Sequence, residues 1–124
     1  MEILQTIIIL GDPVIKKNTK KISKNGGVYY TKIWKEYELK AKLQLSKFPT
    51  YDLPYPVELH FKFFPRTNRR FDLSNMVEGA QDLLQATGHI VDDDWKHITP
   101  VFNGEYGGVI VEPGIPRTEI TIIK

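Results

Sequence analysis

The segment 70–95 constrains this chain most, because it combines a complete helix pattern with a high density of carboxylates. It reads R-F-D-L-S-N-M-V-E-G-A-Q-D-L-L-Q-A-T-G-H-I-V-D-D-D-W. Asp72 is a good N-cap residue, apolar side chains recur at helical spacing, and Thr87-Gly88 is typical of a helix end. The segment therefore predicts an amphipathic helix that starts at Asp72 and leads to three consecutive aspartates, Asp92, Asp93 and Asp94.

The carboxylates of this segment predict a metal site. Residues 72–94 hold six carboxylates and no Lys or Arg. Mg²⁺ prefers oxygen ligands and often takes only one or two carboxylates, filling its shell with water and substrate phosphate. Asp72 and Asp93 are candidates for these two ligands, but the helix between them spans roughly 20 Å at about 1.5 Å per residue. They meet only if residues 88–93 fold back or if a second subunit supplies one of them.

The charges of the chain are unevenly distributed. Residues 1–50 carry ten Lys and four acidic residues, a net charge of +6, whereas residues 51–124 carry seven basic and eleven acidic residues, a net charge of −4. A basic half joined to an acidic centre suits a protein that grips phosphates with one surface and does metal chemistry with another. A solvated, lysine-rich face is the alternative interpretation of the same distribution.

Length and composition narrow the class of protein. The 124 residues correspond to a single domain, 1–124, and no Cys is present for a disulfide or a thiolate zinc site. No apolar run approaches the roughly 18 residues of a membrane span. The first residues, M-E-I-L-Q-T-I-I-I-L, place Glu2 where a signal peptide has a basic residue, so they predict a strand. We expect a cytoplasmic protein without a membrane partner.

The hydrophobic pattern predicts an α+β fold, a small mixed β-sheet with two main helices packed on it. Strands are expected at 3–10 and 56–64, an extended stretch at Ile98–Tyr106 that ends at Gly107-Gly108, and a last strand at Thr118–Ile123. The lysine-rich residues 15–30, with Asn25-Gly26-Gly27 at their centre, predict a loop or hairpin. In the strand 56–64, Glu58, His60 and Lys62 are expected on the exposed face.

The other predicted helix runs from Lys32 to about Lys47, capped by Thr31. Its expected core face consists of apolar residues near helical spacing: Ile33, Trp34, Tyr37, Ala41, Leu45 and Phe48, widened by Leu39 and Leu43. The second helix is expected to bury Leu73, Met76, Val77, Ala80, Leu83 and Leu84 and to expose Asn75, Glu78, Asp82 and Gln85.

The helix-and-aspartate segment resembles the RusA-like Holliday-junction resolvases, small homodimeric endonucleases of bacteria and their phages. The family pattern is a basic run, D-x-D-N-L-x-K, a helix with an internal Asp, a Gly, and a D-D pair. This chain has R69-R70-F71-D72-L73-S74-N75-M76-V77-E78, then Asp82, Gly88 and Asp92-Asp93, without a gap. The opening strand followed by G-D-P-V-I-K-K-N is similar to the family more weakly.

Two departures from the family pattern affect the implied site. Ser74 replaces the second aspartate of D-x-D, and Glu78 replaces the helix lysine. Because positions i and i+4 share a helix face, Glu78 can restore the missing carboxylate. The resemblance then implies Asp72, Glu78 and Asp93 as catalytic residues and metal ligands, supported by Asp82 and Asp92, with Mg²⁺ or Mn²⁺ bound. The lost lysine removes a cation near the reacting phosphate, and Lys17, Arg69 and Arg70 are candidates to replace it.

The resemblance implies a homodimer that resolves four-way DNA junctions by paired nicks, in a bacterial or phage-encoded cytoplasmic protein. The residues expected to contact branched DNA are Lys16, Lys17, Lys20, Lys21, Arg66, Arg69, Arg70 and Phe71. Phe71 either wedges between bases or is buried under its loop, and Trp95 either packs at a dimer interface or stacks on an unpaired base. Two alternatives remain: a catalytically weakened DNA-binding protein of the same fold, and a small interaction module with an acidic cluster and no nucleic-acid role.

Overall fold

The structure, a computed structural model, describes residues 2–16, 20–22, 28–30, 32–103 and 107–124. Its sheet has the order β1 (Ile3–Leu10), β7 (Arg117–Ile123), β4 (Val57–Phe64) and β5 (Ile98–Val101). A short strand, β6 (Gly108–Val109), pairs with the far end of β4. β1 and β4 lie antiparallel to β7, whereas β5 and β6 run parallel to β4. The predicted mixed sheet is confirmed.

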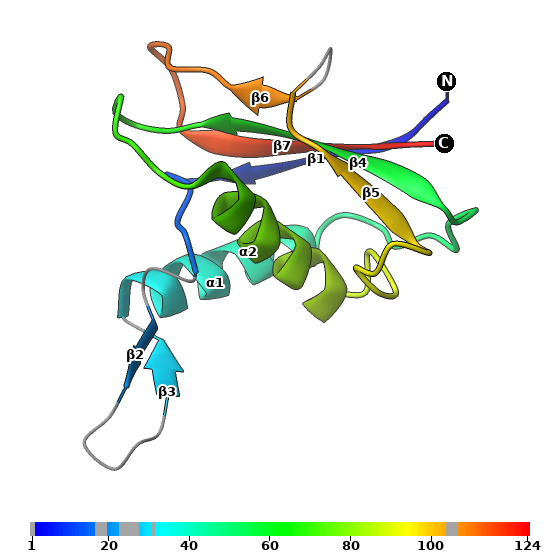
Figure 1. The fold of residues 1–124 in the computed structure, drawn as a ribbon, viewed down its shortest axis with the longest axis horizontal. Coiled ribbons are helices and arrows are strands. Elements are labelled where there is room, and N and C mark those ends of the chain that lie inside the picture. Colours follow the sequence, from blue (N-terminus) through cyan, green and yellow to red (C-terminus); the bar gives the residue numbers. More distant parts are fainter. Residues whose placement is uncertain (1, 17–19, 23–27, 31, 104–106) are drawn as a thin grey trace.

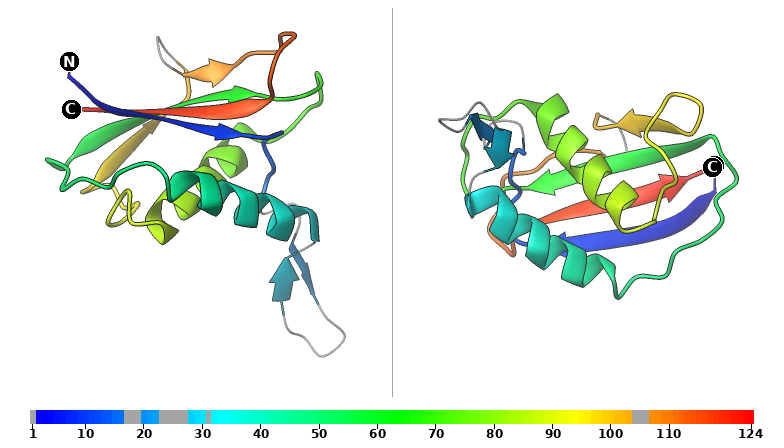
Figure 2. Two further views of the ribbon diagram at one scale, coloured as in Figure 1. Left: turned by 180° about the vertical axis from the view of Figure 1, so that it is seen from behind. Right: turned by 90° about the horizontal axis from the view of Figure 1, so that it is seen from below.

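Both predicted helices, α1 (Lys32–Leu45) and α2 (Leu73–Ala86), lie on the same side of the sheet (Figures 1 and 2). A separate hairpin of β2 (Lys20–Ile22) and β3 (Val28–Tyr30) projects from the end of this layer, away from the sheet (Figure 1). The predicted hairpin is therefore confirmed, although its Asn25-Gly26-Gly27 tip and the proposed cap Thr31 lie outside the described residues. The α+β prediction is confirmed as a two-layer arrangement.

The core lies between the helices and the central strands. On β4, alternate residues face the helices and are buried: Val57, Leu59, Phe61 and Phe63. Ile120 of β7 pairs with Ile7 on one side and with Phe61 on the other, and all three are fully buried. Burying a side chain of this size contributes roughly 1.5–3 kcal/mol. This central row fixes the register of the strands and hence the positions of the loops at their ends.

The prediction of a wide buried face on α1 is wrong. Only Trp34, Ala41 and Leu45 are buried there, while Ile33, Leu39 and Leu43 are 64%, 63% and 59% exposed. The helix lies beside the edge strand β1, where the side-chain amide of Gln44 accepts from Leu10 N at 2.7 Å and donates to Leu10 O at 2.9 Å. A helix that covers a sheet edge buries a narrower stripe than one lying across the sheet centre.

Three strand details also differ from the sequence prediction. His60, expected to be exposed, is 8% exposed, and its Nε2 lies 2.8 Å from Glu58 Oε1. β4 is a central strand bonded on both sides, so its second face is more enclosed than alternation alone suggests. β5 ends at Val101 rather than Tyr106, and Gly108 begins a strand instead of breaking one.

Candidate active site

Helix α2 begins as its sequence predicts, and its cap involves the candidate ligand Asp72. Asp72 Oδ1 accepts a hydrogen bond from Asn75 N at 3.2 Å, which satisfies one of the free N–H groups at the helix start. The same oxygen accepts from Ser74 Oγ at 2.7 Å. Ser74, at the family's second aspartate position, thus binds to Asp72 in the present structure. Asp72 has a capping role and keeps an exposed position at the N-terminal end of α2.

The exposed side of α2 carries a stripe of polar residues. Met76, Val77, Ala80, Leu83 and Leu84 are buried against the sheet, whereas Glu78 is exposed and Asp82 is partly exposed. Glu78 and Asp82 are four residues apart and share this face. Ten residues separate Asp72 from Asp82, which corresponds to about 15 Å along the helix. The carboxylates of α2 are therefore spread along the helix rather than gathered in one cluster.

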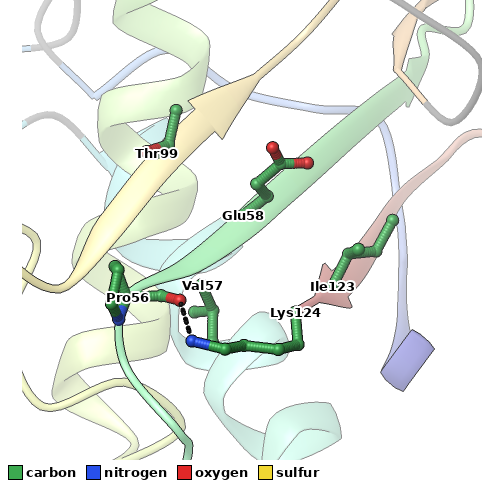
Figure 3. A pocket seen from close by; sticks show the side chains of 6 residues that line it. All are labelled: Pro56, Val57, Glu58, Thr99, Ile123 and Lys124. Atoms are coloured by element: carbon green, nitrogen blue, oxygen red, sulfur yellow. Dashed lines mark hydrogen bonds between the residues drawn. The ribbon is translucent and has the colours of Figure 1, made fainter. Parts of the chain in front are cut away.

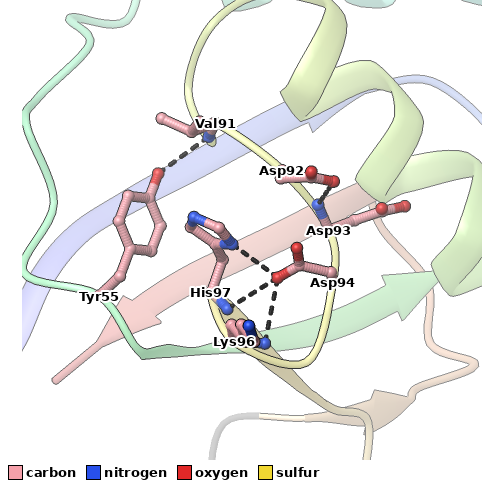
Figure 4. A network of polar contacts seen from close by, with 7 residues as sticks. All are labelled: Tyr55, Val91, Asp92, Asp93, Asp94, Lys96 and His97. Atoms are coloured by element: carbon pink, nitrogen blue, oxygen red, sulfur yellow. Dashed lines mark hydrogen bonds and ion pairs between the residues drawn. The ribbon is translucent and has the colours of Figure 1, made fainter.

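The loop after α2 is held against the segment between α1 and β4. Gly88 has a φ of 79°, a left-handed conformation that suits glycine at the helix end. His89 is 2% exposed, and its ring lies 2.7 Å from Thr87 Oγ1 and 3.1 Å from Phe48 O. Val91 N donates to Tyr55 Oη at 2.9 Å. These contacts anchor the start of the aspartate loop, defined here as residues 91–97 (Figure 4).

The three aspartates of this loop have different partners. Asp94 Oδ1 accepts from Lys96 N at 3.0 Å, from His97 N at 3.1 Å, and lies 2.6 Å from His97 Nδ1. These hydrogen bonds, first of all that of the His97 side chain, hold the pKa of Asp94 below its usual range. Asp94 therefore shapes the turn that leads into β5. The sequence analysis did not separate Asp94 from its neighbours, although a His three residues after an Asp was a signal for such a turn.

We expect Asp94→Ala to lower the stability of the protein in a pH-dependent way. Its folded-state pKa is depressed, so its contribution is present above the usual aspartate pKa of about 3.9 and is lost as the pH falls through the folded-state value. The urea midpoint of the variant should lie below that of the wild type at pH 7, and the two should converge below about pH 4. A difference between the midpoints that is constant with pH would contradict this role.

Asp92 and Asp93 point away from Tyr55 and His97 (Figure 4). Asp92 Oδ1 accepts from Asp93 N at 2.8 Å. Partial burial and then the negative charges of Asp82 and Asp92 raise the pKa of Asp93. The carboxylate of Asp82 is therefore close enough to act on Asp93. The aspartate loop therefore lies near the side of α2 that carries Asp82, and the expected meeting of Asp93 with Asp72 stays a prediction.

These carboxylates fit a hydrated metal ion better than an enclosed one. Within the part of the chain that the structure describes, no three His, Asp or Glu side chains are grouped so that they could hold a metal by themselves. Mg²⁺ does not need three, because it keeps several waters and takes one or two carboxylates together with substrate phosphates. Asp93, with Asp82 or Asp92, provides hard oxygen donors of this kind. Such an ion would neutralise charge and activate water at the exposed side of α2.

A cation also reaches this end of α2 from a distant part of the chain. Lys16 Nζ lies 3.1 Å from Asp82 Oδ2, although 66 residues separate the two. Neither periodicity nor a local motif signals such a pair, so the sequence analysis placed Lys16 only among the residues expected to contact DNA. The structure places Lys16 beside the carboxylate of Asp82.

The predicted arginines Arg66, Arg69 and Arg70 lie in the segment that leads into the start of α2. A groove of about 260 Å³ is lined by Asp12, Pro13, Val14, Ile15, Ile33, Arg69, Arg70, Phe71 and Met76. Arg66 and Arg70 are exposed, while Phe71 is partly buried and packs against the core. Lys20 and Lys21 belong to β2 of the projecting hairpin, and Lys17 lies outside the described residues. The exposed arginines thus precede the start of the helix that carries the acidic stripe.

Another hollow, of about 410 Å³, lies where β4, β5 and β7 meet (Figure 3). Its Lys124 ammonium donates to Pro54 O at 2.8 Å and to Pro56 O at 3.1 Å. Glu58, which lines the same hollow, is paired with His60. Structural contacts therefore engage both charged lining residues, and the α2 face remains the better candidate for chemistry.

Comparison with known proteins identifies the family of the chain. No curated protein sequence matches the chain significantly. The described helices include none that is long and apolar enough to cross a membrane. The sequence model of the family described as Endodeoxyribonuclease RusA matches residues 11–123, which include the groove at the start of α2, α2 itself and the aspartate loop. The chain belongs to the RusA endodeoxyribonuclease family.

Proposed function

We propose that this protein is a divalent-metal-dependent endonuclease that resolves four-way DNA junctions as a homodimer. The observation that carries the proposal is the match of residues 11–123 to the RusA endodeoxyribonuclease family, supported by the carboxylates of α2 and of the aspartate loop. Mg²⁺, or Mn²⁺ in its place, would be held by Asp93 with Asp82 or Asp92. Glu78 lies one turn before Asp82 on the same helix face, and Asp72 caps the start of α2. Both would act on the same DNA strand or complete a site across the dimer.

In this proposal, the basic residues bind DNA and the acidic residues bind the metal. The exposed arginines beside the groove, together with the lysines of the β2–β3 hairpin, would hold the phosphates of the junction arms. The carboxylates would position the metal and the attacking water for in-line displacement at a phosphodiester, with the metal neutralising the developing charge. A two-fold dimer would match the two-fold symmetry of a four-way junction and place two such sites for paired nicks.

The direct test uses pure protein with a four-way junction and a matched linear duplex, each with Mg²⁺ or with EDTA. The proposal requires paired nicks in the junction that depend on Mg²⁺, and much slower cleavage of the duplex. Sedimentation at micromolar concentration should give a dimer. A monomer under these conditions would contradict the paired-nick mechanism, and cleavage in EDTA would contradict the metal requirement.

A second candidate function is supported by the departures at two positions. Ser74 is hydrogen-bonded to Asp72, and Glu78 is exposed in place of a lysine, so the family's helix motif is altered at its centre. A junction-binding protein with weakened catalysis would keep the basic surfaces and lose the chemistry. Tight, salt-sensitive junction binding without nicks at any Mg²⁺ or Mn²⁺ concentration would favour this second function.

We expect Trp95 to report directly on DNA binding. Trp95 is 82% exposed in the aspartate loop, with Lys96 Nζ 5.7 Å from its ring centre, whereas Trp34 is 1% exposed in the core. Junction binding should quench the tryptophan emission of the wild type and leave that of Trp95→Phe nearly unchanged. A blue shift that depends on protein concentration without DNA would instead place Trp95 at the dimer interface. Full binding without a change in emission would contradict a position next to DNA.

A further inference from the structure

The groove at the start of α2 combines apolar walls with arginines. Its apolar lining comes from three separate parts of the chain, which are the segment before the hairpin, α1 and the start of α2: Val14, Ile15, Ile33, Phe71 and Met76. Met76 and Ile15 are 2% and 9% exposed, whereas Ile33 is 64% exposed. The fold therefore leaves a large aliphatic side chain of α1 in solvent where it lines the groove.

Hydrogen bonds join two sides of this groove. Asp12 Oδ1 accepts from Arg66 N at 2.8 Å and from Arg69 Nη1 at 2.9 Å. Arg69 Nη2 also donates to Pro13 O, and the guanidinium carbon of Arg69 lies 5.8 Å from the ring centre of Phe71. The segment before the hairpin and the loop before α2 are thus fixed to each other. The groove is therefore formed before a ligand binds, which lowers the entropy cost of binding.

The charges of the lining residues favour an anionic ligand. Asp12 lines the groove, but its carboxylate is paired with Arg69. Arg70 lines the same groove and is exposed. Two arginines and one aspartate give the lining a net positive charge. A ligand that matches both the walls and these charges therefore has an apolar face and a negative group.

A nucleotide of DNA has both properties when its base is unpaired. The face of a base is covered by its neighbours in a duplex, and an unpaired base costs least to remove from the stack. Apolar and aromatic side chains bind the exposed face of such a base, while arginines bind its phosphate. The groove has a volume of about 260 Å³, below the roughly 300–1,000 Å³ of pockets for drug-sized ligands. It therefore suits one base rather than two.

We propose that the groove at the start of α2 binds one unpaired nucleotide of the DNA, with its base on the apolar walls and its phosphate at Arg70. This inference rests on the proposed function, because it names the form of DNA that the site on α2 would receive. Asp72 directly follows Phe71 in the chain and caps α2, so the groove lies next to a carboxylate proposed to act on the DNA. The groove would select strands that present an unstacked base at this position.

The first test compares the binding of two single strands to the whole protein in EDTA. One strand consists of thymidine nucleotides, and the other has the same length but lacks every base. Both carry the same phosphates, so the ratio of their affinities measures base binding alone. Ile33→Ser removes one apolar wall of the groove. Leu39→Ser is the matched control, because Leu39 is 63% exposed on the same helix and does not line the groove. Circular dichroism melting checks the folding of each variant.

We expect the wild type and Leu39→Ser to bind the thymidine strand about 10-fold more tightly than the abasic strand, and Ile33→Ser to lose most of this preference. The affinity for the abasic strand should be the same in all three proteins, because the phosphate contacts are unchanged. Equal affinity of the wild type for both strands, or an equal preference in the two variants, would overturn the inference alone. A wild type that binds neither the strands nor a four-way junction would overturn the proposed function as well.

Photo-crosslinking of the wild type then locates the base without any substitution. The probe is a single strand with one 5-iodouracil, a base that reacts with aromatic and sulfur-containing side chains when irradiated. Mass spectrometry should find the crosslink at Phe71 or Met76, which line the groove. A crosslink to the exposed Trp95, with none at Phe71 or Met76, would place the base on the aspartate loop and overturn the inference.

Discussion

Asp93→Asn is expected to reduce junction cleavage on the order of 10²–10³-fold while junction binding is kept or becomes tighter. The amide has nearly the same shape as the carboxylate but lacks the charge that holds a divalent ion. The same loss of charge removes a repulsion between the site and the DNA phosphates, which explains why binding should not suffer. Single-turnover cleavage with a labelled junction gives the rate, and a gel-shift assay in EDTA gives the affinity.

Asp52→Asn is the matched control for this change. Asp52 is an exposed aspartate in the segment before β4 and lies outside the proposed site, so its loss should leave both rate and affinity unchanged. Cleavage by Asp93→Asn at close to the wild-type rate would remove Asp93 from the site. A parallel loss of cleavage in Asp52→Asn would show that overall charge, rather than position, controls the reaction.

The same variant has a second readout in its stability. Burial and the charges of Asp82 and Asp92 raise the folded-state pKa of Asp93, so its ionised form costs stability once the pH rises through that value. Asp93→Asn should therefore unfold at a higher urea concentration than the wild type at pH 7. The difference should vanish below the usual aspartate pKa of about 3.9, where both proteins carry a neutral group. The addition of Mg²⁺ should stabilise the wild type only, because metal binding favours the ionised Asp93.

Local signals explain which parts of the fold were predictable from the sequence. Helix α2 was predicted with its cap at Asp72 and its end at Thr87-Gly88, because capping depends on residues a few positions apart. The inward face of β4 was likewise predicted from alternation. The exposure of Leu39 and Leu43 on α1 was not predicted, because it depends on which strand the helix covers. Strand order is a property of the whole sheet and cannot be derived from local signals.

The site was predictable only as a set of residues. The sequence identified the carboxylates, but Asp92, Asp93 and Asp94 are chemically identical until the loop gives them different partners. The Lys16–Asp82 pair joins positions 66 residues apart, and it depends on how the segment before the hairpin crosses α2. The expected meeting of Asp72 with Asp93 remains a prediction.

Junction binding is expected to weaken steeply with salt, because the proposed interface consists of exposed lysines and arginines. Each phosphate neutralised on a duplex arm contributes about 0.9 to the slope of log K against log salt. If a dimer makes about six such contacts, its affinity should fall roughly 10³-fold between 50 and 200 mM salt. Titrations in EDTA, where cleavage is blocked under the proposed mechanism, measure this slope for the junction and for a linear duplex.

Single-charge variants locate the contacts that produce the slope. Arg70→Gln should reduce the magnitude of the salt slope by about one for each chain in the complex, because Arg70 is exposed beside the groove at the start of α2. Lys47→Gln is the matched control, since it removes one exposed charge just after α1, away from that groove. An equal effect of both variants would show that binding depends on net charge alone. A slope near zero in the wild type would contradict a phosphate-binding surface and therefore both DNA-based functions. The remaining function would then be that of an interaction module that uses the acidic α2 face as its contact site.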